Sequence, residues 1–308
     1  WFNKSSAFTE EERDELGLRG LLPPRVSTFD EQVTRLKGII DTYEKPINKY
    51  IVLEGAHNSD ESLYFELLVR YIDQFLPIVY TPTVGQACLQ YSHIFRYARG
   101  LYVSTEDKGR VRQLVANVPH KDVDIIVVTD GQRILGLGDL GVNGMGIPVG
   151  KLALYTACAG VNPQKTLPVC IDVGTNNEEL LNDPLYMGLR QKRVTGPEYD
   201  ALIAEFVDAV RERWPNVVIQ FEDFHNSHAY DLLDQYKDKV PCFNDDIQGT
   251  ASVVLTGMFS SMRILKQQLK DQKVLFLGAG SAATGIAHLI ADAMVEEGLT
   301  REEALARI

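Results

Sequence analysis

The stretch VVIQFEDF, Val217–Phe224, is typical of a buried strand that ends in two acidic residues. Leu167–Val173 is another continuous apolar run of strand length, and Tyr199–Arg213 between the two has the apolar spacing of an amphipathic helix. A strand, a helix and a second strand in this order indicate a parallel sheet covered on both faces. Upstream, Val123–Thr129 and Arg133–Leu137 flank a turn-rich link and predict a β-hairpin.

The chain before this sheet has the pattern of helices. Residues 1–98 are predicted to form a helical N-terminal domain, with helices over Phe29–Tyr43 and Asp60–Phe75. Thr81 as an N-cap and Pro82 at the first helical position predict a further helix, which leaves Tyr80 at the junction.

The chain after the sheet predicts the first half of a Rossmann-type dinucleotide-binding domain. Gly249–Leu269 reads as a helix, Lys273–Leu277 as a strand and Ser281–Glu297 as a second helix. Between strand and helix lies Gly278-Ala279-Gly280-Ser281-Ala282-Ala283, where small residues permit a tight turn and free N–H groups favour a pyrophosphate. A purely structural turn is the alternative. The acid that would bind an adenosine ribose is expected on the next strand, beyond Ile308.

Two other glycine motifs resemble nucleotide loops but lack a required feature. Gly136–Gly141 matches G-x-G-x-x-G, but Asp139 within it would repel phosphates, so this loop is predicted to position other groups. Gly150-Lys151 resembles the end of a P-loop, but Met145 and Leu152 stand at positions where that motif needs glycine and a hydroxyl residue.

Composition narrows the classes of partner. The formal net charge of −11 argues against nucleic-acid binding, which needs clustered Lys and Arg. No run of about 18 uninterrupted apolar residues is present, so no membrane span is expected. The scattered cysteines predict reduced core thiols in an intracellular protein, in the cytoplasm or the mitochondrial matrix. They are Cys88, Cys158, Cys170 and Cys242.

Two pairs of acids predict a metal site. Glu222 and Asp223 follow a strand, and Asp245 and Asp246 follow in CFNDDIQGT, Cys242–Thr250. In a low-dielectric setting, four carboxylates without partners would either have raised pKa values or would destabilise the fold. A divalent cation removes that conflict. Ligation by oxygen alone favours Mg²⁺ or Mn²⁺ over zinc. The alternative is that Asp245 or Asp246 is simply a helix N-cap.

Several long segments, in this order, resemble the signature segments of malic enzymes. The resemblance covers essentially the whole chain and implies that family's fold for it. The segments are LLPP (Leu21–Pro24), YTPTVG (Tyr80–Gly85), RILGLGDLG (Arg133–Gly141), GIPVGK (Gly146–Lys151), CIDVGT (Cys170–Thr175), FEDF (Phe221–Phe224) and FNDDIQGT (Phe243–Thr250).

The resemblance implies oxidative decarboxylation of L-malate to pyruvate and CO₂ with NAD or NADP and with Mn²⁺ or Mg²⁺. It makes residues 99–246 the catalytic domain that binds malate and metal, and residues 247–308 the start of the NAD(P)-binding domain. The implied site residues are Glu222, Asp223 and Asp246 as metal ligands, Lys151 as general base, Tyr80 as general acid, Asp245 beside the lysine, Arg133 as the malate-binding arginine, and Asn226, Gly278, Ala279, Gly280 and Ser281 as cofactor contacts.

The implied chemistry suits these residue types. A lysine removes the C2 hydroxyl proton near neutral pH only if burial or neighbours lower its pKa. Asp245 would act in the opposite direction, so we expect it to orient Lys151 or relay its proton. The metal would polarise the C2 carbonyl of oxaloacetate, Tyr80 would protonate C3, and Arg133 would hold a carboxylate bidentately.

Other interpretations stay open at this point. Outside these motifs, Tyr80 would read as a packed aromatic residue, and Arg133 and Lys151 as surface residues. A malolactic enzyme, which releases lactate, and an inactive metal- or nucleotide-binding fragment are the competing functions. Arg35 matches one of two arginines that bind fumarate in some malic enzymes, but Ser59 stands at the second position, so fumarate activation is not expected.

The chain has the features of a piece of a longer polypeptide. It starts at Trp1, and Ile308 falls inside the unfinished Rossmann pattern. Malic enzymes continue for a few hundred residues beyond this point, so we expect the 308 residues alone to be poorly active or inactive. For the full-length protein we expect a homo-oligomer, a dimer or a tetramer.

Overall fold

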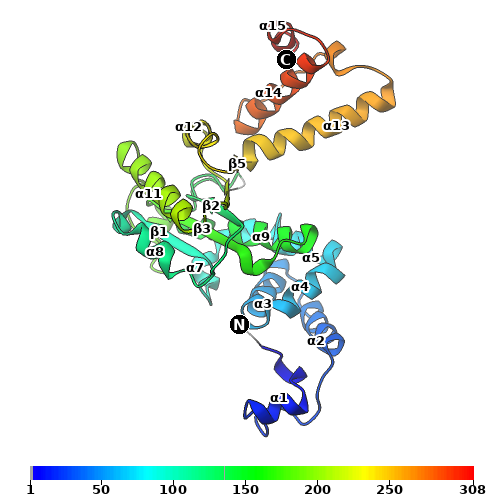
Figure 1. Cartoon of the computed structure of the whole chain (residues 1–308), viewed down its shortest axis with the longest axis vertical. Helices are drawn as coiled ribbons and strands as arrows, with labels where there is room; N and C mark the ends of the chain where they lie inside the picture. The colour runs from blue at the N-terminus through cyan, green and yellow to red at the C-terminus, as the bar shows by residue number, and fades with distance from the viewer. Residues whose placement is uncertain (1–2, 135) are drawn as a thin grey trace.

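A computed structural model describes residues 3–134 and 136–308. Figure 1 shows helices at both ends of the chain and one sheet between them. The α-helices are α1 (Glu10–Glu15), α2 (Phe29–Asp41), α3 (Pro46–Ser59), α4 (Glu61–Arg70), α5 (Ile72–Val79), α6 (Thr83–Leu89), α7 (Tyr91–Ile94), α8 (Val111–Asn117), α9 (Gly146–Ala159), α10 (Glu178–Asn182), α11 (Pro197–Arg213), α12 (Asn226–Tyr236), α13 (Thr250–Leu265), α14 (Ser281–Glu296) and α15 (Arg301–Leu305). The strands are β1 (Leu101–Ser104), β2 (Ile125–Thr129), β3 (Thr166–Asp172), β4 (Val218–Phe221) and β5 (Cys242–Asn244).

The five strands form a parallel sheet in the order β1-β3-β2-β4-β5, which confirms the predicted α/β architecture. The predicted hairpin is wrong. Strand β2 pairs with β3 on one side and β4 on the other, so neither edge is free for an antiparallel partner. The chain after β2 makes only an isolated bridge between Ile134 and Gly138, and Leu135 lies outside the described residues.

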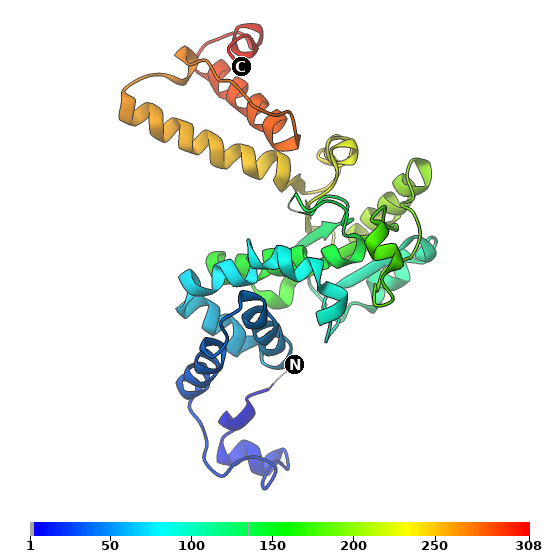
Figure 2. The same ribbon diagram turned by 180° about the vertical axis from the view of Figure 1, so that it is seen from behind.

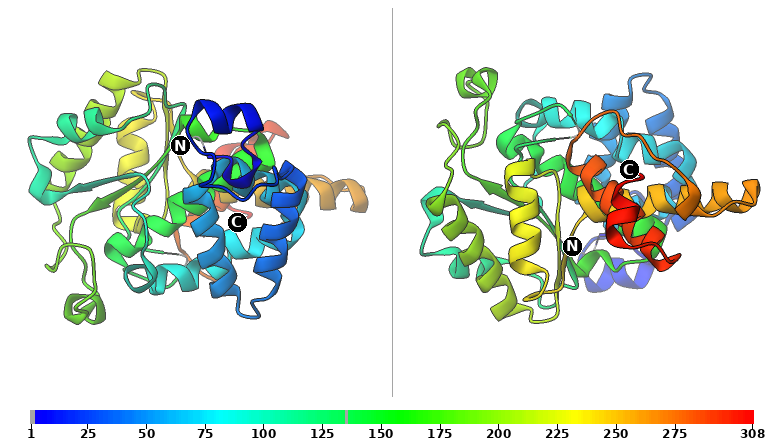
Figure 3. Two further views of the ribbon diagram at one scale, coloured as in Figure 1. Left: turned by 90° about the horizontal axis from the view of Figure 1, so that it is seen from below. Right: turned by 90° about the horizontal axis from the view of Figure 1, so that it is seen from above.

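Helices cover both faces of the sheet (Figure 3). Alternate residues of β3 face opposite ways: Val169 and Ile171 pack with α8, α11 and α12, whereas Cys170 packs with the start of α9. The first of these clusters contains Phe206, which is fully buried on α11. Because β3 is buried on both faces, its sequence is continuously apolar and does not alternate.

The N-terminal helices form a second core with α9. Two details differ from the expectations. The helix predicted over 60–75 is divided at Tyr71, whose φ of −129° and ψ of 40° are not helical. Helix α6 begins at Thr83 with Pro82 in the cap position, so Thr81 is not the N-cap; the Thr83 hydroxyl donates to the Pro77 carbonyl instead. Tyr80 lies at the junction of α5 and α6, as predicted.

Helices α13, α14 and α15 form an arm that extends away from the sheet (Figures 1 and 2). The two long helices begin within one residue of the expected positions. The strand predicted over 273–277 is absent among the described residues. That segment has no neighbouring strand to pair with, so only Val274 and Phe276 pack inward, while Leu275 and Leu277 are fully exposed.

No helix in the described ranges is long and apolar enough to cross a membrane. All four cysteines, each within these ranges, are free thiols, as predicted, but only Cys88 and Cys170 are buried; the expected core position is wrong for Cys158, which is exposed.

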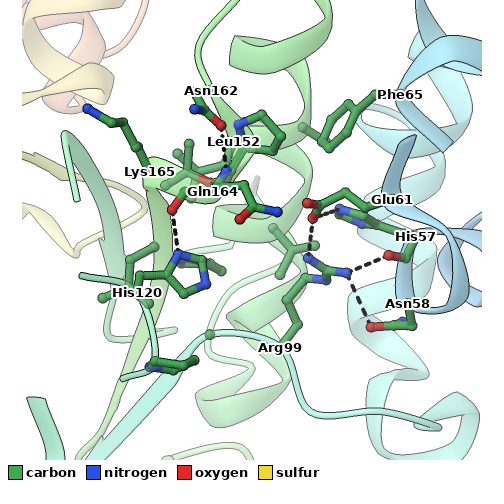
Figure 4. A pocket seen from close by; sticks show the side chains of 18 of the residues that line it. His57, Asn58, Glu61, Phe65, Arg99, His120, Leu152, Asn162, Gln164 and Lys165 are labelled. Atoms are coloured by element: carbon green, nitrogen blue, oxygen red, sulfur yellow. Dashed lines mark hydrogen bonds and ion pairs between the residues drawn. The ribbon is translucent and has the colours of Figure 1, made fainter. Parts of the chain in front are cut away.

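A cavity of about 740 Å³ lies at the amino ends of the strands, between the sheet and the N-terminal helices (Figure 4). His57 on its wall is 5 % exposed and stacks on Tyr64 at 3.9 Å between ring centres. Its ring nitrogens lie 3.8 Å from the carboxylates of Glu54 and Glu61, and Arg99 is the nearby cation. Burial outweighs the two carboxylates and lowers the pKa of His57 below its ordinary 6.5.

This burial makes stability depend on pH. Below a pH of 6.5 the unfolded chain binds a proton that folded His57 resists, so the free energy of unfolding falls on acidification. His57→Phe keeps a ring against Tyr64 but cannot titrate. Urea unfolding of both proteins should show a decline below about pH 6.5 that is shallower in the variant, by up to about 1.4 kcal/mol per pH unit. Equal slopes would contradict the assignment.

Candidate functional site

Four acids meet at the carboxyl edge of the sheet. Strands β4 and β5 are parallel neighbours, with Phe221 opposite Asn244, so the residues that follow both strands lie side by side. Glu222 and Asp223 follow β4, and Asp245 and Asp246 open a π-helical turn after β5, Asp245–Gly249 (η5). Each acidic pair begins directly after one of these two paired residues. The register therefore brings the two pairs of acids together.

The adjacent aspartates have different partners. The Asp245 Oδ2 atom lies 2.7 Å from the Lys151 ammonium, whereas Asp246 Oδ2 accepts a hydrogen bond from the Asp223 backbone N–H at 2.8 Å. Asn244 fixes the turn, since its side-chain oxygen accepts from the Ile247 N–H. The predicted association of Asp245 with Lys151 is therefore present in the structure.

Lys151 joins the two acidic loops. It lies on α9, and its ammonium is 2.8 Å from Glu222 Oε1 as well as 2.7 Å from Asp245 Oδ2. Burial acts to lower its pKa, but the charge of Glu222 and the hydrogen bonds to both carboxylates outweigh that effect and raise the pKa. In this arrangement Lys151 is a cation, so the lowered pKa that a general base requires is not present here.

Tyr80 is held against the same carboxylate. Its hydroxyl donates to Glu222 Oε1 at 3.3 Å, and the Lys151 ammonium lies 5.0 Å from the centre of its ring. Burial, with the nearby charge of Glu222, raises the pKa of Tyr80. Gly150 permits this approach, because a Cβ there would lie 2.6 Å from the Val79 carbonyl oxygen and 3.1 Å from the Tyr80 ring. The glycine before the lysine thus has a packing role.

Sequence reasoning missed two residues that position Glu222, one by direct contact and the other through the first. The Gln220 amide donates to Glu222 Oε2 at 2.5 Å, and Tyr155 on α9 donates to the Gln220 side-chain oxygen, also at 2.5 Å. Gln220 is fully buried. It is the polar residue inside the apolar run VVIQF. A polar side chain in a buried strand needs a hydrogen-bond partner, and this exception to the apolar pattern could have indicated its role.

The acids suit a divalent cation in their chemistry. Burial raises the pKa of Glu222 to about 7, and burial with the charge of Asp245 raises the pKa of Asp246. Carboxylates with such pKa values gain from a hard cation. The present side-chain arrangement does not form such a site: within residues 3–134 and 136–308, no three His, Cys, Asp or Glu side chains converge to hold a metal.

Arg133 brings the predicted substrate and cofactor residues together. Its guanidinium donates to Asn226 Oδ1 at 2.6 Å and to Ser281 Oγ at 3.1 Å. Its backbone N–H donates to the Asp223 carbonyl at 3.1 Å. A Cβ on Gly280 would lie 3.4 Å from the same guanidinium. Residues from the loop after β4, from α12 and from the start of α14 therefore surround one arginine.

The glycine-rich loop lies at the start of α14, as predicted, although no strand precedes it in the described residues. Gly278 has a φ of +122°, which favours glycine, while Ala279 lies between it and Gly280. Gly285 sets the position of α14, because a Cβ there would lie 2.6 Å from the Ile247 carbonyl oxygen. This close packing holds the helix N-terminus beside the acidic turn.

The buried ion cluster gives a stability prediction. Lys151→Met leaves Glu222 and Asp245 without their cation and should cost about 3–5 kcal/mol in the free energy of unfolding at about pH 9, well above the pKa of about 7 of Glu222. Adding Glu222→Gln to that variant removes one stranded charge and should recover at least about half of the loss. Urea unfolding measures both.

Lys165→Met is the matched control. Lys165 is 40 % exposed and pairs with Asp124 at 3.3 Å, so its loss should cost under about 1 kcal/mol. Equal costs for the two lysines, or no recovery in the double variant, would mean that the Lys151 cluster is not a buried ion pair in solution.

Comparison with known proteins identifies the family of this chain. The family model "Malic enzyme, N-terminal domain" matches residues 57–237, and "Malic enzyme, NAD binding domain" matches residues 247–308. NAD-dependent malic enzyme 2 of Photobacterium profundum is 51 % identical over 99 % of this chain and 55 % of the relative. NADP-dependent malic enzyme of Mus musculus is 54 % identical over 99 % of this chain and 54 % of the relative.

The chain thus spans about half the length of the relatives it matches. Among solved structures, the crystal structure of Entamoeba histolytica malic enzyme is 23 % identical, with a TM-score of 0.45, and the match covers 92 % of this chain and 49 % of that one. The matched ranges include the lysine helix α9 and the glycine-rich loop, whereas Asp245 and Asp246 lie between the two ranges. This chain belongs to the malic enzyme family.

Proposed function

We propose that the protein carrying this chain converts L-malate to pyruvate and CO₂ with NAD or NADP as the hydride acceptor and Mn²⁺ or Mg²⁺ as the metal. The observation that carries the proposal is the contact of Lys151 with both Glu222 and Asp245, beside the Tyr80 hydroxyl. The relatives at 51 % and 54 % identity are named NAD-dependent and NADP-dependent malic enzymes, respectively. The homo-oligomeric state and the intracellular location stay predictions.

Glu222, Asp223 and Asp246 would hold the divalent cation, which when bound supplies a Lewis acid at the C2 oxygen of the substrate. Asn226 and Gly278–Ser281 would hold the nucleotide, which when bound would supply a hydride acceptor for C2. The Arg133 guanidinium, now shared between Asn226 and Ser281, is suited to bind a malate carboxylate bidentately.

Lys151 and Tyr80 would move the protons. The charge of Glu222 is the largest influence that raises the pKa of Lys151, so Lys151 can act as a base once that charge is compensated by another partner. It would then take the proton of the C2 hydroxyl, with Asp245 at 2.7 Å to orient it and carry the proton onward. Tyr80, kept protonated by burial, would deliver its proton to C3 after CO₂ leaves.

The proton donor gives a kinetic prediction. Tyr80→Phe keeps the buried ring and removes only the hydroxyl, so kcat for pyruvate formation should fall by about 10²- to 10⁴-fold with little change in the KM for malate. Tyr102→Phe is the matched control, because the Tyr102 hydroxyl is also partly buried but pairs with Tyr91, away from Glu222. Comparable losses in both variants would remove Tyr80 from the mechanism.

Product analysis tests the proposed reaction itself. With L-malate, Mn²⁺ and NAD⁺ or NADP⁺, the protein should form pyruvate and reduced nucleotide in equal amounts. Lactate without net reduced nucleotide would identify a malolactic enzyme instead. If neither product forms while the protein is folded and binds Mn²⁺, the proposal is wrong and the site is a non-catalytic metal-binding one.

A further inference from the structure

Arg193 is a buried arginine that the proposed mechanism does not use. It lies in the loop before α11, and its side chain is only 2 % exposed. One terminal nitrogen donates to the Asp130 carbonyl at 2.8 Å and lies 2.9 Å from Asp130 Oδ2. The other donates to Asp139 Oδ1 at 3.1 Å and to the Gly174 carbonyl at 3.2 Å. One guanidinium thus holds two carboxylates and two carbonyls.

The two carboxylates mark the ends of one loop. Asp130 directly follows β2, and the chain from Asp130 to Gly141 ends where the 3₁₀ turn η3, Gly141–Met145, begins. Asp130 Oδ1 accepts from the Gln132 N–H at 3.0 Å, and Asp139 Oδ1 accepts from the Gly141 N–H at 3.0 Å. Arg193 therefore ties the start of the loop to its end, and each anchored carboxylate also shapes the adjoining backbone.

Neighbouring groups complete both anchors. The Tyr199 hydroxyl donates to Asp130 Oδ2 at 3.0 Å. The Thr175 hydroxyl donates to Asp139 Oδ1 at 2.9 Å, and the Asn176 N–H donates to Asp139 Oδ2 at 2.7 Å. The Gly136–Gly141 motif is predicted to position other groups and not to bind a phosphate. Asp139 agrees with that prediction, because its carboxylate binds protein groups on both oxygens.

The loop carries Arg133, three residues after Asp130. Its position at the site depends on the loop, because its backbone N–H bonds the Asp223 carbonyl while its side chain reaches Asn226 and Ser281. Arg193 is too deeply buried to contact a substrate. Any influence that it has on substrate binding must pass through the loop.

We propose that Arg193 is a positioning residue that fixes the 130–141 loop and so aims Arg133 at a substrate carboxylate. This inference rests on the proposed function only for the identity of the substrate. A lysine cannot replace the arginine, because a single ammonium cannot span two carboxylates and two carbonyls in a planar fork.

Arg193→Lys tests the proposal kinetically in the protein that carries this chain. We expect kcat/KM for malate to fall by about 10- to 100-fold, mainly through KM, while the KM for the nucleotide changes less than about twofold. In an Arg133→Ala background the same change should add less than about twofold, because the group it positions is gone. A full additional loss in that background would overturn the proposal.

Arg13→Lys is the matched structural control. Arg13 is 3 % exposed and donates to the carbonyls of Phe8, Pro23 and Ser6, far along the chain from the loop. It should affect the unfolding midpoint without a selective rise in the malate KM. If Arg193→Lys fails to fold, Asp139→Asn, which weakens one anchor, should show the same selective rise in malate KM at smaller size. An unchanged malate KM there would overturn the proposal.

Hydrogen exchange gives a readout that needs no turnover. In Arg193→Lys the amides of Gln132 and Gly141 should exchange faster than in the parent, since their acceptors are the anchored carboxylates of Asp130 and Asp139. Unchanged exchange there would refute the positioning role. If exchange is faster but the parent protein does not consume malate, Arg193 does anchor the loop and the proposed reaction is wrong.

Discussion

The contact of one lysine with two acidic loops is the interaction on which the rest of the site depends. Lys151, Glu222 and Asp245 come from α9 and from the ends of β4 and β5, and the lysine ammonium lies 2.8 Å from Glu222 and 2.7 Å from Asp245. Buried carboxylates without a cation would be costly, so the lysine permits the two loops to approach. The remaining acids, Asp223 and Asp246, are drawn into the same place by the strand register.

The fold holds this cluster from three sides. Gly150 lets α9 press against Tyr80, and Gly285 lets α14 press against the turn that contains the aspartates. The hydrogen-bonded chain from Tyr155 through Gln220 fixes the second oxygen of Glu222. The acids are thus positioned by close backbone packing and by neutral hydrogen bonds as well as by charge. That combination fixes the acidic loops and Glu222 relative to α9 and α14.

Much of the fold was predictable because its signals are local. The apolar run of β4, the helix over Pro197–Arg213 and the acids after β4 and β5 follow from periodicity and from the edge at which parallel strands end. The hairpin prediction failed because a turn sequence does not reveal that β2 is already paired on both edges. The segment 273–277 has strand propensity but no partner, and propensity alone does not form a ladder. The roles of Gln220 and Arg193 depend on residues far away in the chain, which spacing cannot show.

The central claim is that the neighbouring aspartates serve different partners, Asp245 the lysine and Asp246 a divalent cation. Mn²⁺ titration followed by electron paramagnetic resonance separates them, because the two variants Asp245→Asn and Asp246→Asn differ by one position in the same turn. The account predicts that Asp246→Asn weakens Mn²⁺ binding at least about tenfold, whereas Asp245→Asn changes it less than about threefold. Equal effects of the two changes, or undiminished binding in Asp246→Asn, would contradict it.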